Sequence, residues 1–139
     1  MKAPLFSDIL RISQNIADAS NKDNEVARAE QYQSLIKLCA ANENSPKDHP
    51  LQWEALADFT NDSEQAIDIY DKGLACAEKL QLVDYRASIY LAMAQRYEEM
   101  EELDKASEFA HHANALVEDV ENEELITDIK QYLANLPTS

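Results

Sequence analysis

Glycine is almost absent from this chain, with one residue in 139, and only four prolines accompany it. So little of either residue leaves few places for tight turns, which favours long helices joined by short connections. The single glycine also excludes the phosphate-binding loops of nucleotide-dependent enzymes and the nucleophile elbow of serine hydrolases, because each motif needs at least two glycines at fixed spacing.

Basic residues are scarce as well. The chain has 12 Lys and Arg against 27 Asp and Glu, which gives a net charge of −15. Direct binding of nucleic acid needs basic residues to neutralise phosphates, and anionic membranes attract basic segments, so we expect neither partner. The negative charge would instead steer basic partners towards the protein.

Cysteine and histidine are too few and too scattered for a metal site. Cys39 and Cys76 form no CxxC pair, and we expect two buried, inert thiols. His111 and His112 are adjacent, so on a helix their side chains point about 100° apart and do not share the face that a metal pair needs. His49 has no companion in its loop. We therefore expect no metal and no cofactor, and the lack of any catalytic motif predicts that the protein is not an enzyme.

Long apolar segments are missing too. No stretch reaches the roughly 18 apolar residues of a membrane-spanning helix. The first residues, MKAPLFSDIL, do not resemble a signal peptide, because Ser7 and Asp8 interrupt the apolar run. With 45% hydrophobic residues the chain can bury a core of its own. We expect a single cytoplasmic domain that is a monomer or a weak homodimer.

Two stripes of mostly small residues organise the chain. Their members recur at steps of three and four, as on one face of a helix. The first stripe is Ala66, Tyr70, Gly73, Ala77 and Leu80, and the second is Leu103, Ala106, Ala110, Ala113 and Val117. Ala66 and Ala106 lie forty positions apart, as do Tyr70 and Ala110. This constant offset predicts helical hairpins that stack closely through Ala and Gly.

The same periodicity predicts about seven helices and no sheet, because no segment alternates with period two. We expect a first hairpin over residues 5–41, repeats over 50–82 and 84–118, and a capping helix over 122–136, all within one domain of residues 1–139. Helix caps are expected at Ser7, at Asp62 or Ser63, and at Asn122. In the second helix of the first hairpin, the residues expected to face inward are Val26, Ala29, Tyr32, Leu35, Ile36 and Cys39.

The middle of the chain resembles the tetratricopeptide repeat (TPR) family. The motif is Tyr90-x-x-Met93-Ala94-x-x-Tyr97, followed by Ala106, Ala110 and Ala113. The forty-residue offset is similar to the longer variety of this repeat. The resemblance implies antiparallel hairpins stacked as a short right-handed superhelix. In place of the turn glycine usual in the family, one unit has Asn61, which tolerates a left-handed backbone, and the next has Glu101.

The resemblance also implies a binding groove, because the first helix of each TPR hairpin lines the concave surface. The matching positions are Asp48, Leu51, Ala55, Asp58, Ser88, Leu91, Gln95 and Glu98. These residues are acidic and partly apolar, and none is the Lys, Arg or Asn that holds a peptide's C-terminal carboxylate in the family. A basic segment of a partner protein with one apolar anchor would fit them, and Leu91 is the expected contact for that anchor.

Two functions therefore remain open. The first is a non-enzymatic protein-interaction module, an adaptor or co-chaperone-like scaffold, that binds its partner in the groove. The alternative is an acidic regulator or nucleic-acid mimic that blocks a basic surface of its target. Residues 98–128 support this second reading, because they contain twelve acidic residues and a single basic one, Lys105.

Overall fold

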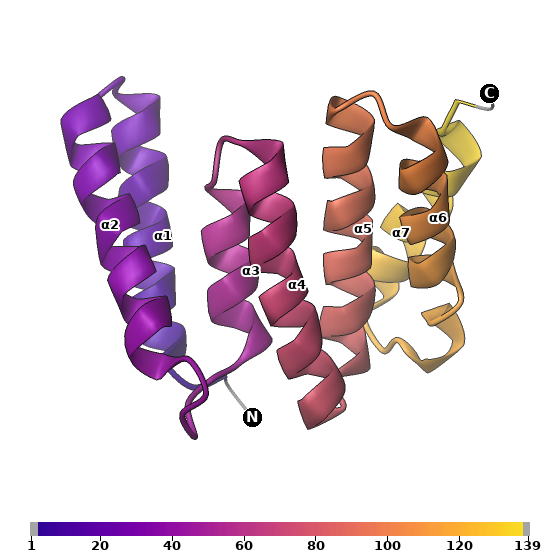
Figure 1. Ribbon diagram of the computed structural model, residues 1–139, viewed down its shortest axis with the longest axis horizontal. Helices are drawn as coiled ribbons and strands as arrows, with labels where there is room; N and C mark the ends of the chain where they lie inside the picture. Colours follow the sequence, from indigo (N-terminus) through magenta and orange to yellow (C-terminus); the bar gives the residue numbers. More distant parts are fainter. Residues whose placement is uncertain (1–2, 138–139) are drawn as a thin grey trace.

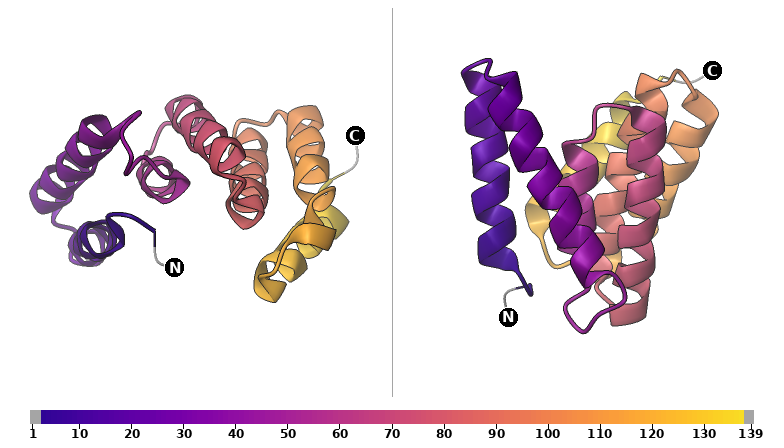
Figure 2. Two further views of the ribbon diagram at one scale, coloured as in Figure 1. Left: turned by 90° about the horizontal axis from the view of Figure 1, so that it is seen from below. Right: turned by 60° about the vertical axis from the view of Figure 1, so that its left-hand side comes forward.

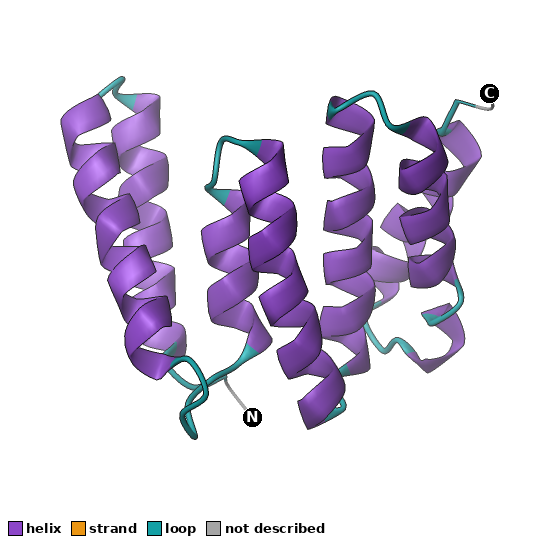
Figure 3. Cartoon of the chain, in the orientation of Figure 1, coloured by secondary structure: helices purple, strands orange, loops and turns teal. Residues whose placement is uncertain are grey.

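The structure, a computed structural model, describes residues 3–137, and within that range the chain forms seven α-helices, one short 3-10 helix and no strand (Figures 1 and 3). The elements are α1 (Phe6–Asn21), α2 (Glu25–Asn42), α3 (Pro50–Asp58), α4 (Ser63–Leu80), α5 (Val83–Glu99), α6 (Leu103–Asn114), η1 (Val117–Asp119) and α7 (Glu123–Asn135). The predicted all-α class is confirmed.

The helices lie in two rows, which the left view of Figure 2 shows end-on. The first row consists of α1, α3, α5 and α7, and the second row of α2, α4 and α6. Each hairpin takes one helix from each row, and its second helix also contacts the first helix of the next hairpin. The first row curves, so that α1 and α7 project on the same side (Figure 2). The hairpins are thus stacked in chain order.

Side-chain caps define four helix starts, two of them as predicted. The Asn24 side chain accepts a hydrogen bond from the Ala27 amide at the start of α2. Asp62 accepts a hydrogen bond from the Glu64 amide at the start of α4, and Asn122 accepts one from the Leu125 amide at the start of α7. The His49 imidazole accepts from the Leu51 amide ahead of α3. The expected Ser7 cap is wrong, because α1 begins at Phe6, and Leu5 precedes it without a capping side chain.

The small-residue stripes explain how closely the helices pack. Ala66, Ala77, Ala106, Ala110 and Ala113 are all completely buried. A Cβ atom added to Gly73 would lie 3.1 Å from the Trp53 Cβ and 3.1 Å from the Ile89 Cδ1, so α4 approaches both α3 and α5 at this glycine. A larger side chain there would push two helices apart.

The stripes fail at their ends. Leu80 is 45% exposed in the last turn of α4, and Val117 lies in η1, beyond the end of α6. In α2 the expected inward positions Val26 and Ala29 are exposed, Val26 by 71%. Both residues lie in the first turns of α2, so the buried stripe of this helix begins only with Tyr32 and Leu35.

Turns without glycine use ordinary residues in the left-handed conformation. Gln81 has φ 57° after α4, and Glu101 has φ 61° after α5. Asn61 was expected to behave in the same way, but it is not among the residues with positive φ. The α3–α4 turn is stabilised instead by Arg96 of α5, which donates to the carbonyls of Ala57 (3.0 Å) and Thr60 (2.8 Å).

Substituting Glu101 tests the strain in this turn. A non-glycine residue in the left-handed conformation destabilises the folded state by about 1–2 kcal/mol. Glycine removes this strain, but it also makes the unfolded chain more flexible, so only part of the energy is regained. Glu101→Gly should therefore stabilise the fold by up to about 1 kcal/mol in urea unfolding. Glu101→Ala removes the same charge but keeps the strain, so equal stability of the two variants would contradict the prediction.

Candidate binding hollow on the first row

A hollow of about 520 Å³ opens between α3, α5 and α7 of the first row. Its lining residues are Leu51 and Glu54 from α3, Asp84, Tyr85 and Ser88 from α5, and Asn122, Glu124, Leu125 and Asp128 from the start of α7. We call this set the acidic hollow. It contains four carboxylates, and none of its described lining residues is Lys or Arg.

Asp84 fixes the position of α7 in the acidic hollow. Its carboxylate accepts hydrogen bonds from the amides of Glu121 (3.0 Å) and Asn122 (3.1 Å), directly before α7 begins. The same carboxylate therefore satisfies two backbone donors and ties the loop before α7 to the first turn of α5. Glu124 and Asp128 then follow one turn apart on α7, so both face the hollow.

Glu54 is the most unusual carboxyl group of the hollow. It is half-buried between α3 and α5, and the Ser88 hydroxyl donates to its Oε2 at 2.6 Å. Burial raises the pKa of Glu54 to about 7, Asp58 one turn further along α3 raises it as well, and only the Ser88 hydrogen bond lowers it. Glu54 therefore exchanges its proton near neutral pH, unlike an ordinary surface glutamate.

The walls of the hollow are partly apolar. Leu51 and Leu125 line it from α3 and α7, and the Tyr85 ring lines it from α5. The Tyr85 ring also meets the buried His49 ring edge-on, with centroids 5.0 Å apart, which orients the tyrosine. Carboxylates beside aliphatic and aromatic walls suit the charged head and the hydrocarbon stem of a Lys or Arg side chain.

The structure distributes the eight predicted groove residues over several places. Leu51 and Ser88 line the acidic hollow. Asp58 and Gln95 line a separate recess of about 330 Å³, and Asp58 accepts a hydrogen bond from the Tyr70 hydroxyl. Glu98 accepts one from the Tyr132 hydroxyl of α7 at 2.8 Å. Ala55 packs against the core of the first hairpins.

Two more of the eight predicted positions, Leu91 and Asp48, do not line the acidic hollow either. Leu91 is only 8% exposed, because it packs in a cluster with Ala113 of α6 and Ile129 of α7, so it does not offer an open anchor contact. Asp48 belongs to the loop before α3 and lies outside the acidic hollow. It accepts hydrogen bonds from the Asn44 amide and from the side chains of Gln52 and Trp53.

The Asp48 hydrogen bonds explain its electrostatics. Burial alone would raise the pKa of Asp48, but the bonds from Asn44, Trp53 and Cys76 outweigh it and lower the pKa. Burial, and secondly the hydrogen bond with Asp48, raise the pKa of the Cys76 thiol to about 12. Burial also raises the pKa of Cys39 to about 12. Neither thiol is activated for chemistry.

Sequence reasoning missed most of the hollow. Glu54 occupies a position where the repeat pattern has a small residue. A charged residue at such a position could have indicated that Glu54 belongs to a binding site. Glu124 and Asp128 carried no such signal, because helix-start carboxylates also occur for their favourable interaction with the helix dipole. Their role depends on where α7 packs. The hydrogen bonds of Asp84 to the loop before α7 determine that position.

A second, more apolar groove lies between α2 and α4. Its volume is about 430 Å³, and Ile36, Trp53 and Ile69 are among its lining residues. Lys72 lies above the Trp53 ring at 5.1 Å and forms an ion pair with Glu43 at 3.0 Å, so the chain's own side chains bridge this groove.

No group of three or more His, Cys, Asp or Glu side chains within the described residues is placed to hold a metal ion. In residues 3–137, no helix is both long enough and apolar enough to cross a membrane.

Removing the ionisable group of Glu54 should change how stability depends on pH. The pKa of Glu54 is higher in the folded chain, about 7, than its ordinary value of 4.5, so the folded state loses stability as pH rises through about 7. Glu54→Gln should therefore unfold at a higher temperature than the parent at about pH 8, with the difference shrinking towards about pH 5.

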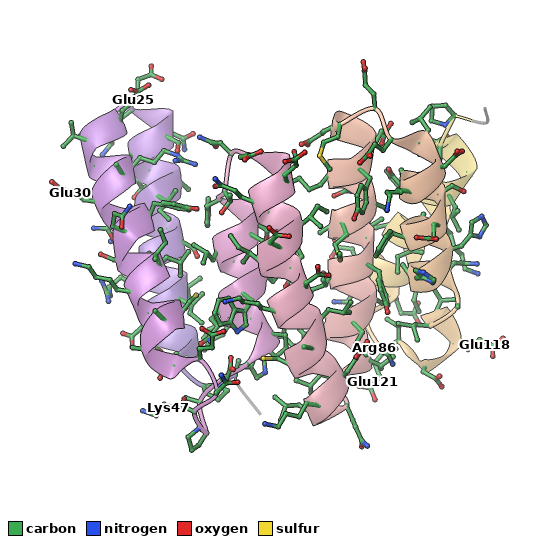
Figure 4. All side chains as sticks on the ribbon, in the orientation of Figure 1. Glu25, Glu30, Lys47, Arg86, Glu118 and Glu121 are labelled. Carbon is green, nitrogen blue, oxygen red and sulfur yellow. The ribbon has the colours of Figure 1, made fainter. Side chains whose placement is uncertain are left out.

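The control for this measurement is Glu30→Gln, which removes one charge from an exposed position on α2 far from the hollow (Figure 4). It should show no comparable pH-dependent difference. If Glu54→Gln differs from the parent by the same amount at every pH, the carboxyl group of Glu54 is not perturbed by folding.

Comparison with known proteins adds no relative. No protein-family model matches the chain, and no curated protein and no solved structure matches it. The TPR resemblance therefore remains a prediction from the residues that carry it, and function has to be argued from the geometry of the acidic hollow.

Proposed function

We propose that this protein is a non-enzymatic interaction module that binds a basic segment of a partner protein in the acidic hollow. One observation carries the proposal: Glu54, Asp84, Glu124 and Asp128 surround a hollow of about 520 Å³ whose described lining residues include no basic side chain. A cationic ligand would relieve the mutual repulsion of these carboxylates, so charge complementarity favours it over any neutral or acidic ligand.

The walls of the hollow favour a segment that is amphipathic as well as basic. Leu51, Leu125 and Tyr85 provide apolar surface beside the carboxylates. This surface, rather than the buried Leu91, would contact the apolar anchor of the ligand. An apolar residue of the ligand would lie against it while the neighbouring Lys or Arg approaches the carboxylates. The ion pairs set the rate of association, and the apolar contact slows dissociation.

The scaffold suits this role. Hairpins stacked in chain order, with the first helix of each in one curved row, form an extended surface. This order supports a TPR-like adaptor of the longer repeat type, with α7 as the closing helix. The free thiols of Cys39 and Cys76 suit a reducing compartment, which supports the proposal of a cytoplasmic module.

The alternative function, blocking a basic surface by charge mimicry, has less support from the fold. The acidic residues of 98–128 are spread along the length of the α5–α6 hairpin. Glu101 and Glu102 lie at the α5–α6 turn, whereas Glu118 and Glu121 lie at the opposite end of the hairpin (Figures 1 and 4). The antiparallel hairpin therefore divides a continuous acidic stretch of sequence between two ends of the molecule.

Binding of a blocked synthetic peptide of Arg, Leu and Ala tests the proposed function. Glu124→Gln combined with Asp128→Asn removes two charges from the hollow without changing side-chain shape. It should weaken peptide binding in calorimetry by roughly fivefold, as expected for the loss of two exposed ion pairs. Replacing Arg by citrulline, its neutral isostere, should weaken binding by the parent protein as well.

The matched control is Glu25→Gln combined with Glu30→Gln. This pair also removes one carboxylate from a first helical turn and one from the middle of a helix, but on α2, away from the hollow (Figure 4). It should bind the peptide like the parent. Equal weakening by both pairs would mean that the overall charge of −15 attracts the peptide, which would contradict a site in the hollow and favour the mimic.

A further inference from the structure

We propose that Glu54 is a proton switch within the acidic hollow, so that the hollow binds a cationic side chain more tightly once Glu54 has lost its proton. This inference rests on the proposed function, because it concerns how the same site is regulated. It adds a property that the acidic composition alone does not provide, namely that the affinity depends on the ionisation of one identified side chain.

The geometry places Glu54 where a proton matters. Ser88 of α5 is its hydrogen-bond partner at 2.6 Å, and this hydroxyl is neutral. The charged or titratable groups around Glu54 are Asp58 on its own helix, Asp84 and Tyr85 on α5, and Glu124 and Asp128 on α7. Behind the Tyr85 ring lies His49, whose pKa burial lowers, which favours its neutral form. None of them is a cation, so nothing among these neighbours stabilises the ionised form of Glu54.

Glu54 differs from the other three carboxylates of the hollow in its surroundings. Asp84 accepts two backbone hydrogen bonds, and Glu124 and Asp128 lie in exposed positions on α7. Glu54 is half-buried and lies close to Asp58. Burial, and secondly the like charge of Asp58, favour the neutral carboxyl group and raise its pKa to about 7. The charge of Glu54 therefore changes near neutral pH.

A cationic ligand would reverse this balance. Its positive charge favours ionised Glu54, so binding expels the proton, and the affinity falls when solvent protons compete. If only the ionised form accepts the cation, the competent fraction rises about tenfold between about pH 6 and about pH 8 for a pKa of about 7.

The test measures binding of the blocked Arg, Leu and Ala peptide at about pH 6 and about pH 8, where Arg itself stays charged. The parent should bind about tenfold more tightly at the higher pH. Glu54→Gln should lose this dependence, and Glu30→Gln should keep it. Both variants retain all three histidines, including His49, whose ring meets Tyr85 and whose pKa burial lowers.

Ser88→Ala should raise the pKa of Glu54, whereas Glu54→Gln removes the ionisable group altogether. The Ser88 hydrogen bond lowers the pKa of Glu54, so its removal should shift the midpoint of the binding curve to higher pH without abolishing the dependence. A purely structural role of Glu54 would not produce this shift. Carbon-13 NMR of the Glu54 carboxyl group in the free protein should show the same midpoint as the binding curve of the parent.

The outcomes separate the switch from the proposed function. Binding that is localised to the hollow but equal at both pH values would overturn the switch and leave the function standing. A Glu54 carboxyl signal that titrates near the ordinary value of 4.5 would also overturn the switch. The absence of peptide binding at either pH would overturn the proposed function, and the switch with it.

Discussion

The structure depends on the turn between α3 and α4. Arginines from the two neighbouring hairpins donate hydrogen bonds to its backbone carbonyls. Arg96 of α5 donates to the carbonyls of Ala57 and Thr60, and Arg28 of α2 donates to the Phe59 carbonyl at 3.0 Å. The end of a helix leaves carbonyls without partners, and here two guanidinium groups satisfy them in place of a glycine-based cap. Because the arginines belong to different hairpins, this turn joins all three.

The acidic hollow lies towards the other ends of α3 and α5 from that turn. Arg96 fixes one end of α5 against α3, and the close approach at Gly73 fixes α4 against both helices. Ser88 then lies opposite Glu54, and Asp84 receives the loop that leads into α7. The carboxylates of the hollow are therefore held on three rigid helices. The four carboxylates repel one another in this arrangement. A cationic partner would reduce that repulsion.

The sequence predicted what its periodicity controls and missed what depends on packing between hairpins. Steps of three and four identified the buried faces of α4 and α6, because Ala and Gly are required where helices approach closely. The same steps did not reveal that Val26 would be exposed or that α7 would cover Leu91. A stripe shows which face of a helix is buried, whereas the neighbour that covers it is chosen by contacts far apart in sequence, such as Asp84 with Asn122.

Methyl NMR of leucine-labelled protein tests the central claim, a cation-binding hollow, most directly. Leu51 and Leu125 line the hollow, whereas Leu10 and Leu80 are each 45% exposed elsewhere on the molecule. Titration with the blocked Arg, Leu and Ala peptide should shift the methyl signals of Leu51 and Leu125 in a saturable way and leave those of Leu10 and Leu80 unchanged. Shifts confined to Leu80, or spread evenly over all four residues, would contradict a binding site between α3, α5 and α7.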